Sequence, residues 1–214
     1  MVNDKKELLI MRKRIDLEAS PVLYDRAFTQ KSFVEGWEVR NAEWWYEDGA
    51  FYGKNSLPAP GVIISKKSFP GNVLMDFYGQ TVLPSKHDIN VMWNLSWNEQ
   101  TNTRDLSYVA GVQGWWEGKV GIEKSPEYKV IAGTSCPWFV PGKEYHIQAG
   151  SINGHCFIFV DGKLQLEMMD PEPIDSIKHN RVGFEAYQSI IRIRDFKLRQ
   201  IVWQERNLCY SQEF

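Results

Sequence analysis

The sequence predicts an all-β fold, a sandwich of antiparallel strands, on three observations. From about Pro21 onward, short runs rich in aromatic and β-branched residues are separated by Gly, Pro, Asn and Asp, as is typical of sandwiches and barrels. Several runs alternate apolar and polar residues with the period of two that turns one face of a strand toward a core. Between two such runs stands the pair Asp161-Gly162, and a type I′ hairpin turn requires residues of this kind.

The domain organisation follows from length and composition. The chain of 214 residues has a length at which sandwiches remain undivided, and it contains no internal repeat that would suggest a propeller or a solenoid. The start of the chain is charged, and the apolar residues 8–11 have a spacing compatible with one or two helical turns. We therefore expect an N-terminal extension over residues 1–19, a sandwich domain over residues 20–204 and a C-terminal tail over residues 205–214.

The run at residues 73–82 shows which side chains should face the core. Met75 and Phe77 alternate there with Asp76 and Tyr78. Because successive residues of a strand point to opposite faces, the apolar pair should face the core. The polar pair should face outward.

The run at residues 89–97 alternates in the same way. Trp93 and Trp97 share the apolar side with branched residues, and Asn90 and Asn94 share the other side. Core packing is therefore a stronger interpretation of these two tryptophans than contact with a ligand.

The C-terminal part of the domain predicts two further strands. In the second of them Ile191 and Ile193 alternate with Arg192 and Arg194, and the alternation slips by one residue at Asp195. A β-bulge produces such a slip.

Aromatic residues make up 14% of the chain, and their adjacent pairs cannot all lie in the core. One residue of Trp44-Trp45, and one of Trp115-Trp116, should point outward if each pair lies on a strand. An outward Trp can stack on the apolar face of a pyranose while its N–H donates a hydrogen bond. A loop or dimer contact is the competing interpretation, since aromatic residues also mark interfaces.

Charge and hydropathy exclude several classes of partner. With 25 Lys and Arg against 27 Asp and Glu, the net charge of −2 leaves no basic excess to neutralise the phosphates of a nucleic acid. No apolar run approaches the ~20 residues of a membrane span. The apolar stretch of the charged start is too short for a secretion signal, so we expect a cytoplasmic protein.

We expect no cofactor and no transition metal. Cys136, Cys156 and Cys209 form neither an even disulfide set nor a metal-binding pair. No two histidines have a metal-ligand spacing, and no glycine-rich phosphate loop follows a strand. The sequence leaves open whether the fold binds a structural calcium ion.

Long motifs carry a family resemblance from residue 22 to about residue 203. VLYDRAF…SFVEGWEVRNAEWWYEDGAFYG opens the domain, and PGKEYHIQAGSINGHCFIFVDGKLQLEMMD and RVGFEAYQSIIRIRDFKLRQ close it. They resemble the concanavalin-like jelly-roll proteins of bacterial sugar-utilisation clusters, namely a cytoplasmic family of pectin and rhamnogalacturonan operons and the related 3-keto-disaccharide hydrolase domain family. The resemblance implies a concanavalin A-like jelly-roll sandwich of two antiparallel sheets. It bears on fold more than on function, because the motifs are mostly turns and strands.

The chain departs from the hydrolase family at positions that matter. That family carries a Glu ahead of a V-Q pair where this chain has Gly111, although Gln113 is kept. It also carries Gln and His where this chain has Glu185 and Tyr187. The chemistry of the family is therefore either altered or absent here.

A paired-carboxylate mechanism is disfavoured. The sequence has no E-x-D-x-E strand, and Glu117 and Glu123 would lie ~20 Å apart on one strand at ~3.3 Å per residue, unless a turn at Gly118 or Gly121 folds the run back. Retaining and inverting glycosidases need about 5 Å and about 6.5–9.5 Å between carboxyl groups.

The resulting hypothesis is a protein that acts on a small glycoside or oligosaccharide in a concave groove. The resemblance implies cleavage of a 3-keto-glycoside, a lyase-like elimination that needs a base and an enolate stabiliser. The candidate catalytic residues are Glu185 or His87 as base and Asp76 as a second carboxylate, although a structural role at a turn is the commoner one for a residue such as His87. The side chains expected to bind the sugar are Tyr78, Asn94, Gln113, Trp115, Trp116 and Tyr187. The alternatives are a non-catalytic, lectin-like sugar-binding module and a homodimer that uses its exposed aromatic residues as the interface.

Overall fold

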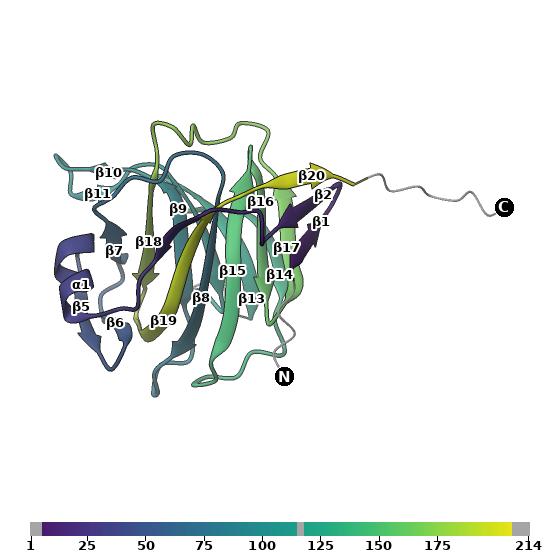
Figure 1. Cartoon of the computed structure of the whole chain (residues 1–214). Helices are drawn as coiled ribbons and strands as arrows, with labels where there is room; N and C mark the ends of the chain where they lie inside the picture. Colours follow the sequence, from purple (N-terminus) through teal and green to yellow (C-terminus); the bar gives the residue numbers. More distant parts are fainter. Residues whose placement is uncertain (1–5, 115–117, 207–214) are drawn as a thin grey trace.

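Two antiparallel sheets face each other in the computed structural model, which describes residues 6–114 and 118–206 (Figure 1). The seven-stranded sheet has the order β14 (Lys129–Ser135), β13 (Lys119–Ser125), β12 (Ser107–Val112), β9 (Ile89–Leu95), β18 (Arg181–Ala186), β7 (Gly61–Ser65) and β4 (Trp37–Arg40). The other sheet, called the eight-stranded sheet, has the order β17 (Lys163–Met169), β16 (His155–Val160), β15 (Tyr145–Ile152), β8 (Val73–Thr81), β19 (Ser189–Gln200), β6 (Ala50–Asn55) and β5 (Glu43–Glu47), and β3 (Val22–Asp25) pairs with β19. The predicted all-β sandwich is confirmed.

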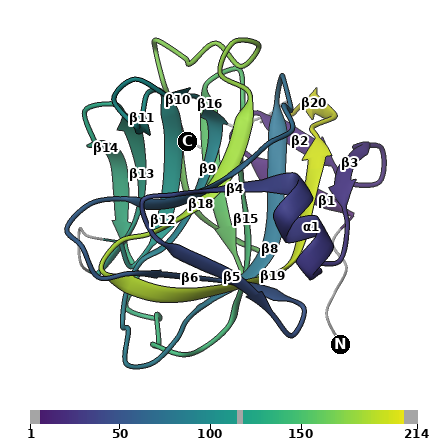
Figure 2. The same ribbon diagram turned by 90° about the vertical axis from the view of Figure 1, so that its left-hand side faces the viewer.

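Three smaller elements complete the fold. A hairpin joins β10 (Trp97–Asn98) to β11 (Thr103–Arg104), and a third sheet contains β1 (Glu7–Ile10), β2 (Lys13–Asp16) and β20 (Trp203–Glu205). The short helix α1 (Gln30–Gly36) begins after Thr29, whose side chain accepts a hydrogen bond from the backbone N–H of Ser32. Figure 2 views the sandwich from the edge at which β4, β5 and α1 lie in front.

The core lies between the two large sheets, and the alternation read from the sequence decides which residues enter it. Met75, Phe77 and Trp93 are fully buried there. The indole Nε1 of Trp93 donates to Ser151 Oγ on the opposite sheet at 2.9 Å. Aromatic residues therefore build much of the core, as the strand pattern predicts.

One prediction about β9 is wrong. Asn94 has a left-handed backbone with φ of 48°, and the pairing of β18 with β9 shifts its register beside it. This bulge moves Leu95 and Trp97 out of the core, because it breaks the alternation. Both side chains instead lie on the outer face of the sheet, where they pack with Val62 and Val109.

Two predicted irregularities are confirmed. Asp161 and Gly162 both have positive φ, of 49° and 72°, as a type I′ turn requires. Asp195 has a φ of 52°, and the register between β19 and β8 shifts at this point. The slip read at this residue is therefore a β-bulge.

The start of the described chain is a strand, so the helical turns expected at residues 8–11 are wrong. Leu8 and Ile10 are buried while Leu9 is exposed, which is the period of a strand. With Ile15, these residues pack on the outer face of the eight-stranded sheet. In Figure 1, β1, β2 and β20 lie together beside β16 and β17.

Within the described residues, no helix has both the length and the apolar character that a membrane crossing needs.

Candidate functional site

The site residues predicted from the sequence divide between the two outer faces of the sandwich. Asp76 and Tyr78 lie on the outer face of the eight-stranded sheet, next to the core residue Phe77. Glu185 lies on the outer face of the seven-stranded sheet, next to the core residue Phe184. Because the core separates the two faces, no single groove contains all three side chains. The expectation of one shared groove is not met.

A buried ion-pair cluster lies on the outer face of the seven-stranded sheet. Arg104, at the end of β11, donates through Nη2 to Glu123 Oε1 on β13 at 2.9 Å and through Nη1 to Glu185 Oε2 on β18. The three residues are between 3% and 5% exposed. One guanidinium thus bridges two carboxylates that come from strands far apart in the sequence.

Asn90 extends this cluster to a third carboxyl group. Its Nδ2 donates to Asp88 Oδ1 at 2.9 Å and lies 3.5 Å from Glu185 Oε1. The backbone N–H of Tyr187 donates to Asp88 Oδ2 at 2.6 Å. Burial, reinforced by the charge of Glu185, raises the pKa of Asp88 well above its usual range. Asp88 therefore keeps its proton to a higher pH than an exposed aspartate.

Two polar atoms of the cluster have no hydrogen-bond partner among the described residues. They are Oδ1 of Asn90, a residue only 1% exposed, and Nε of Arg104. Leaving a buried polar group unsatisfied costs about 1–3 kcal/mol. Such groups are rare in native proteins and call for an explanation, of which a ligand is one.

A row of glycines leads from Asn90 to the edge of the sheet. Gly111, Gly121 and Gly133 lie opposite one another on β12, β13 and β14, and Gly111 lies opposite Asn90 on β9. Their chain neighbours Ala110 and Ile122 face the core, so the glycine positions face outward. This glycine row projects no side chain from the sheet, but only Gly133, at its outer end, is exposed, whereas Gly111 and Gly121 are buried.

A surface hollow adjoins the glycine row at its outer end. It has a volume of about 620 Å³ and is lined by Lys119 and residues 130–135 of β14. Tyr128, which precedes β14, places its ring 4.8 Å from the guanidinium carbon of Arg104. Burial raises the pKa of the Tyr128 phenol, so the phenol keeps its proton. The hollow, the glycine row and the ion-pair cluster together form the candidate site.

Gln113 supports a loop beside this site. Its Oε1 accepts hydrogen bonds from the backbone N–H of Gly118 at 3.1 Å and from Cys136 Sγ at 3.3 Å. Its backbone carbonyl accepts from the N–H of Asp88 at 2.7 Å. Gln113 therefore holds the chain that leads into β9.

Among the described residues, the side chains of the other predicted residues, His87, Asn94 and Tyr187, form no hydrogen bond or ion pair with the ion-pair cluster. His87 directly precedes Asp88, but the carboxyl group of Asp88 binds Asn90 and Tyr187 instead. Tyr187 contributes its backbone N–H, and Asn94 lies at the bulge of β9. Trp115 and Trp116 lie outside the described residues.

The outer face of the eight-stranded sheet carries a separate polar network. Asp76 accepts from Gln148 Nε2 at 2.8 Å and lies 2.7 Å from His146 Nε2. The ring of Tyr78 stacks on His146 at 4.9 Å, and the guanidinium carbon of Arg194 lies 4.4 Å from the Tyr78 ring. The polar side chains of this network therefore find partners among one another on the surface of the sheet.

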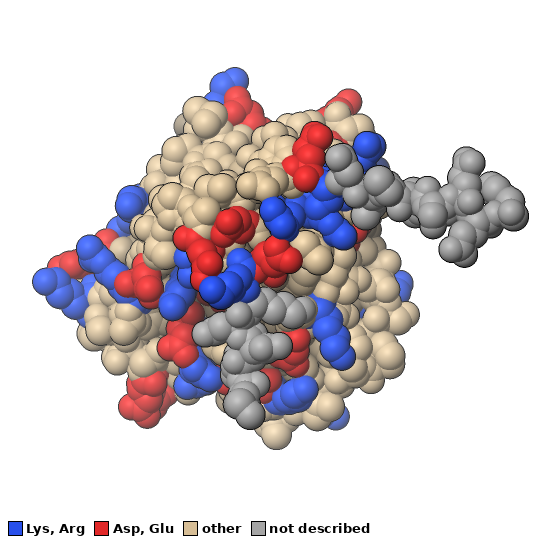
Figure 3. All heavy atoms as spheres, turned by 45° about the vertical axis from the view of Figure 1, so that its right-hand side comes forward, with Lys and Arg blue, Asp and Glu red and all other residues tan. Residues whose placement is uncertain are grey.

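The first tryptophan doublet behaves as the strand pattern predicts. Trp44 is 7% exposed, whereas Trp45 lies on the outer face and stacks on Tyr52 at 5.3 Å. On the side of the molecule drawn in Figure 3, acidic and basic side chains are interspersed and form no large area of one sign.

Another hollow, of about 530 Å³, lies where β3, α1 and β4 meet. Its lining includes Tyr24, Trp37 and Phe69, together with the charged Arg26 and Lys67. Within residues 6–114 and 118–206, no group of three or more His, Cys, Asp or Glu is placed to hold a metal ion.

Sequence reasoning missed Arg104, Glu123 and Tyr128 as members of the site. Arg104 lies in a polar turn with nothing to distinguish it from a solvated residue. Glu123 is separated from Glu117 on its own run by six positions, whereas its partner in the structure, Arg104, comes from another element. The polar face of β9, which includes Asn90, was the feature of the sequence that indicated this site.

No protein-family profile matches this chain, and neither does any curated protein sequence. Solved structures do match its fold. The carbohydrate-binding module CBM66 from Bacillus subtilis has a TM-score of 0.62 at 15% identity, over 77% of this chain and 95% of that module. A Bacillus subtilis protein with a galectin-like fold has a TM-score of 0.66 at 14% identity, over 85% and 96%. Bacillus licheniformis β-glucanase has a TM-score of 0.58 at 9% identity, over 85% and 99%. At these identities the similarity concerns the fold alone, and it shows that the chain is a jelly-roll sandwich of the concanavalin-like and galectin-like kind.

Proposed function

We propose that this protein binds a carbohydrate on the outer face of the seven-stranded sheet, over the glycine row. The observation that carries the proposal is the surface hollow at the exposed Gly133, on the same row as Asn90, whose buried carbonyl has no hydrogen-bond partner among the described residues. The hollow, of about 620 Å³, falls in the range of ligand pockets, about 300–1,000 Å³.

The chemistry of the cluster suits sugar hydroxyls. An amide, a phenol and carboxylates offer donors and acceptors at fixed angles, which is what the recognition of several hydroxyls requires. Arg104 fixes Glu185, and Asp88 fixes Asn90, so these groups are ordered before a ligand arrives. At the exposed Gly133, the absence of a side chain lets a pyranose ring approach the sheet closely.

The similar structures support the same class of ligand. CBM66 is a carbohydrate-binding module, and a β-glucanase acts on a glucan. The motifs that resemble bacterial sugar-utilisation proteins point in the same direction. These likenesses concern fold, so the binding site itself is argued from the residues of this chain.

Cleavage of a 3-keto-glycoside is the second candidate, and the raised pKa of Asp88 beside Glu185 favours it, because perturbed carboxyl groups concentrate at active sites. In this reaction Glu185, or His87 as the alternative base, removes the proton at C2. The electron pair first forms the C2=C3 double bond of an enolate, with the charge on the C3 oxygen. When this oxygen becomes a carbonyl again, the C1=C2 double bond forms and the C1–O bond breaks as the leaving group takes a proton. Water then adds, its hydroxyl to C1 and its proton to C2. Arg104 would stabilise the enolate oxygen that forms at C3.

Calorimetric titration with a saccharide panel tests the binding proposal. Gly133→Val fills the hollow, and it should leave the fold intact because the nearest described atoms to the added Cβ are Val120 O at 3.6 Å and Val130 Cγ1 at 4.0 Å. We expect the affinity of this variant for the saccharide to be at least about tenfold lower than that of the wild type. Asp76→Asn, on the opposite face, is the control and should bind like the wild type. The absence of any saccharide binding, or loss in Asp76→Asn alone, would overturn the proposal.

Release of the aglycone from 3-keto-glycosides and from ordinary glycosides tests cleavage. The second candidate requires turnover of the keto substrates, with a loss in Glu185→Gln or His87→Ala. Thermal melts of both variants separate a chemical loss from an unfolded protein. Saturable binding without turnover would leave a lectin-like module, and unchanged rates in both variants would remove these two bases.

A further inference from the structure

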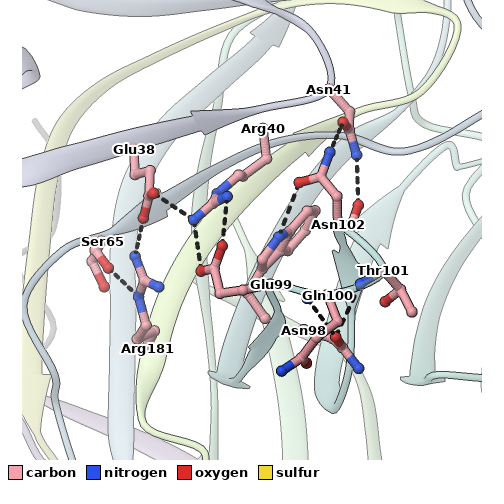
Figure 4. Close-up of polar contacts among 11 residues, drawn as sticks. Glu38, Arg40, Asn41, Ser65, Asn98, Glu99, Gln100, Thr101, Asn102 and Arg181 are labelled. Carbon is pink, nitrogen blue, oxygen red and sulfur yellow. Dashed lines mark hydrogen bonds and ion pairs between the residues drawn. The ribbon is translucent and has the colours of Figure 1, made fainter.

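The hairpin formed by residues 97–104, called the crossing hairpin, connects the candidate site to the far edge of the same sheet. Its tip meets β4, where Arg40 donates to the Glu99 carboxylate at 3.0 Å and 2.8 Å. Next to this pair, Asn102 Nδ2 donates to Asn41 Oδ1 at 2.9 Å, and Asn41 Nδ2 donates to the Asn102 carbonyl at 3.2 Å. Figure 4 shows both contacts between the tip and β4.

The base of the crossing hairpin is fixed by the ion-pair cluster. Arg104, the last residue of β11, lies between Glu123 on β13 and Glu185 on β18. The crossing hairpin is therefore held at both ends, at the edge strand β4 and at the centre of the sheet.

Trp97, which pairs with Arg104 at the base of the crossing hairpin, covers an apolar area of the sheet. Trp97 packs on a cluster of buried outward-facing side chains, and the guanidinium carbon of Arg40 lies 5.4 Å from its ring. The members of this cluster are Val62, Ile64, Met92, Leu95 and Val109. No part of the outer face over β7 is left open, since Val62 and Ile64 are fully buried.

Further hydrogen bonds and ion pairs hold the residues that form the contacts of the crossing hairpin. Glu38 on β4 accepts from Arg40 and from Arg181 Nη2, the latter at 2.8 Å (Figure 4). Within the turn, Asn98 Oδ1 accepts from the backbone N–H groups of Gln100 at 3.0 Å and Thr101 at 3.1 Å. The position of the turn is thus set by β4 and β18, and its shape by its own side chains.

The covered half of the sheet limits the space for a ligand. The seven strands span six spacings of about 4.8 Å, or about 29 Å. The glycine row extends only from β14 to Asn90 on β9, which is three spacings or about 14 Å, and of its members only Gly133 is exposed. Beyond Asn90 the crossing hairpin occupies the face on which a longer ligand would continue.

We infer that the crossing hairpin closes one end of the carbohydrate-binding face, so that the site takes a short saccharide or a chain end and excludes the interior of a polymer. This inference rests on the proposed function. Tip contacts of Arg40 and Asn41 determine this length limit, and the apolar contacts of Trp97 keep the hairpin seated.

The test compares affinity with ligand length. Gluco-, galacto-, rhamno- and galacturono-oligosaccharides of one to six units are titrated against the wild type and against the double variant Arg40→Ala, Asn41→Ala, which releases the tip. In the wild type, affinity should stop rising after the first few units. In the double variant, the affinity for the hexasaccharide should rise at least about fivefold, while the affinity for the monosaccharide should stay unchanged. Glu99→Ala removes the same ion pair from the hairpin side and should show the same gain.

Arg192→Ala is the matched control, because it removes an ion pair with Glu144 on the opposite face. It should leave the dependence on length unchanged. Affinity that keeps rising with length in the wild type, or no gain in either tip variant while monosaccharide binding persists, would overturn the inference and leave the proposed function standing. If no saccharide of any length binds, the proposed function fails and the inference falls with it.

Discussion

Asp88 has a buried side chain, and its titration should be measurable in the pH dependence of the free energy of unfolding. Burial and the charge of Glu185 raise its pKa in the folded state. As the pH rises above about 3.9, the unfolded chain releases this proton while the folded protein retains it. The free energy of unfolding should therefore decrease with pH up to the folded-state pKa. Asn at this position cannot titrate, so the stability of Asp88→Asn relative to the wild type should increase between pH 4 and pH 8. Parallel stability curves for the two proteins would contradict the assignment.

Arg104 neutralises two buried carboxylates, and its loss should be costly. Arg104→Met leaves Glu123 and Glu185 without the cation that now bridges them. We expect the free energy of unfolding to fall by about 3–5 kcal/mol in urea titrations. Adding Glu185→Gln to this variant should recover part of the loss, because one uncompensated charge is then removed.

An exposed arginine provides the comparison. Arg14 pairs with Glu7 at 3.6 Å, and both side chains are about half exposed. Arg14→Met should cost no more than about 1 kcal/mol. A similar cost for both arginines would show that the central cluster is not desolvated as described.

At the scale of elements, the third sheet is attached to the sandwich through a buried histidine. His155 lies on β16. Its Nδ1 lies 3.0 Å from Lys13 Nζ on β2, and its Nε2 lies 2.9 Å from Glu167 Oε2. The backbone N–H of Met11 donates to the same carboxylate at 2.8 Å. Burial lowers the pKa of His155, so the folded protein holds this imidazole neutral.

Acid should therefore weaken this attachment. Below about pH 6.5 the unfolded chain binds a proton at His155 that the folded state resists. The free energy of unfolding then decreases as the pH falls toward the folded-state pKa. The protection factors of the amides of β1 and β2, which correct the exchange rates for the intrinsic slowing in acid, should fall between pH 7.5 and pH 5.5, an excess of exchange over the intrinsic rate. His155→Gln should remove that excess, and an equal excess in this variant would show that another group is responsible.

The elements also show which local features a sequence can reveal. Faces of strands such as β8 were predictable, because the alternation of Phe77 with Asp76 is a local property of the chain. The hairpin at Asp161 and the bulge at Asp195 were predictable for the same reason. Trp97 was placed wrongly because Asn94 adopts a positive φ that an alternating pattern does not announce.

At the scale of the whole molecule, the candidate site could be predicted only in part. Asp76 and Glu185 look alike in the sequence, since each follows or precedes an aromatic core residue. The sheet that each strand joins decides which outer face its side chain reaches, and that pairing is not local. Glu185 and its partner Arg104 are separated by 81 positions along the chain. Their contact arises from strand order, which a single sequence does not contain.

The central claim concerns the location of a ligand on this molecule, and amide chemical-shift mapping by NMR tests it most directly. The protein is titrated with the saccharide that binds most tightly in the panel. The account predicts that the perturbed amides cluster at Gly111, Gly121 and Gly133 and at Asn90, with little change on β8 and β15. Perturbations centred on Asp76 and Tyr78, or on the hollow between β3 and α1, would contradict it.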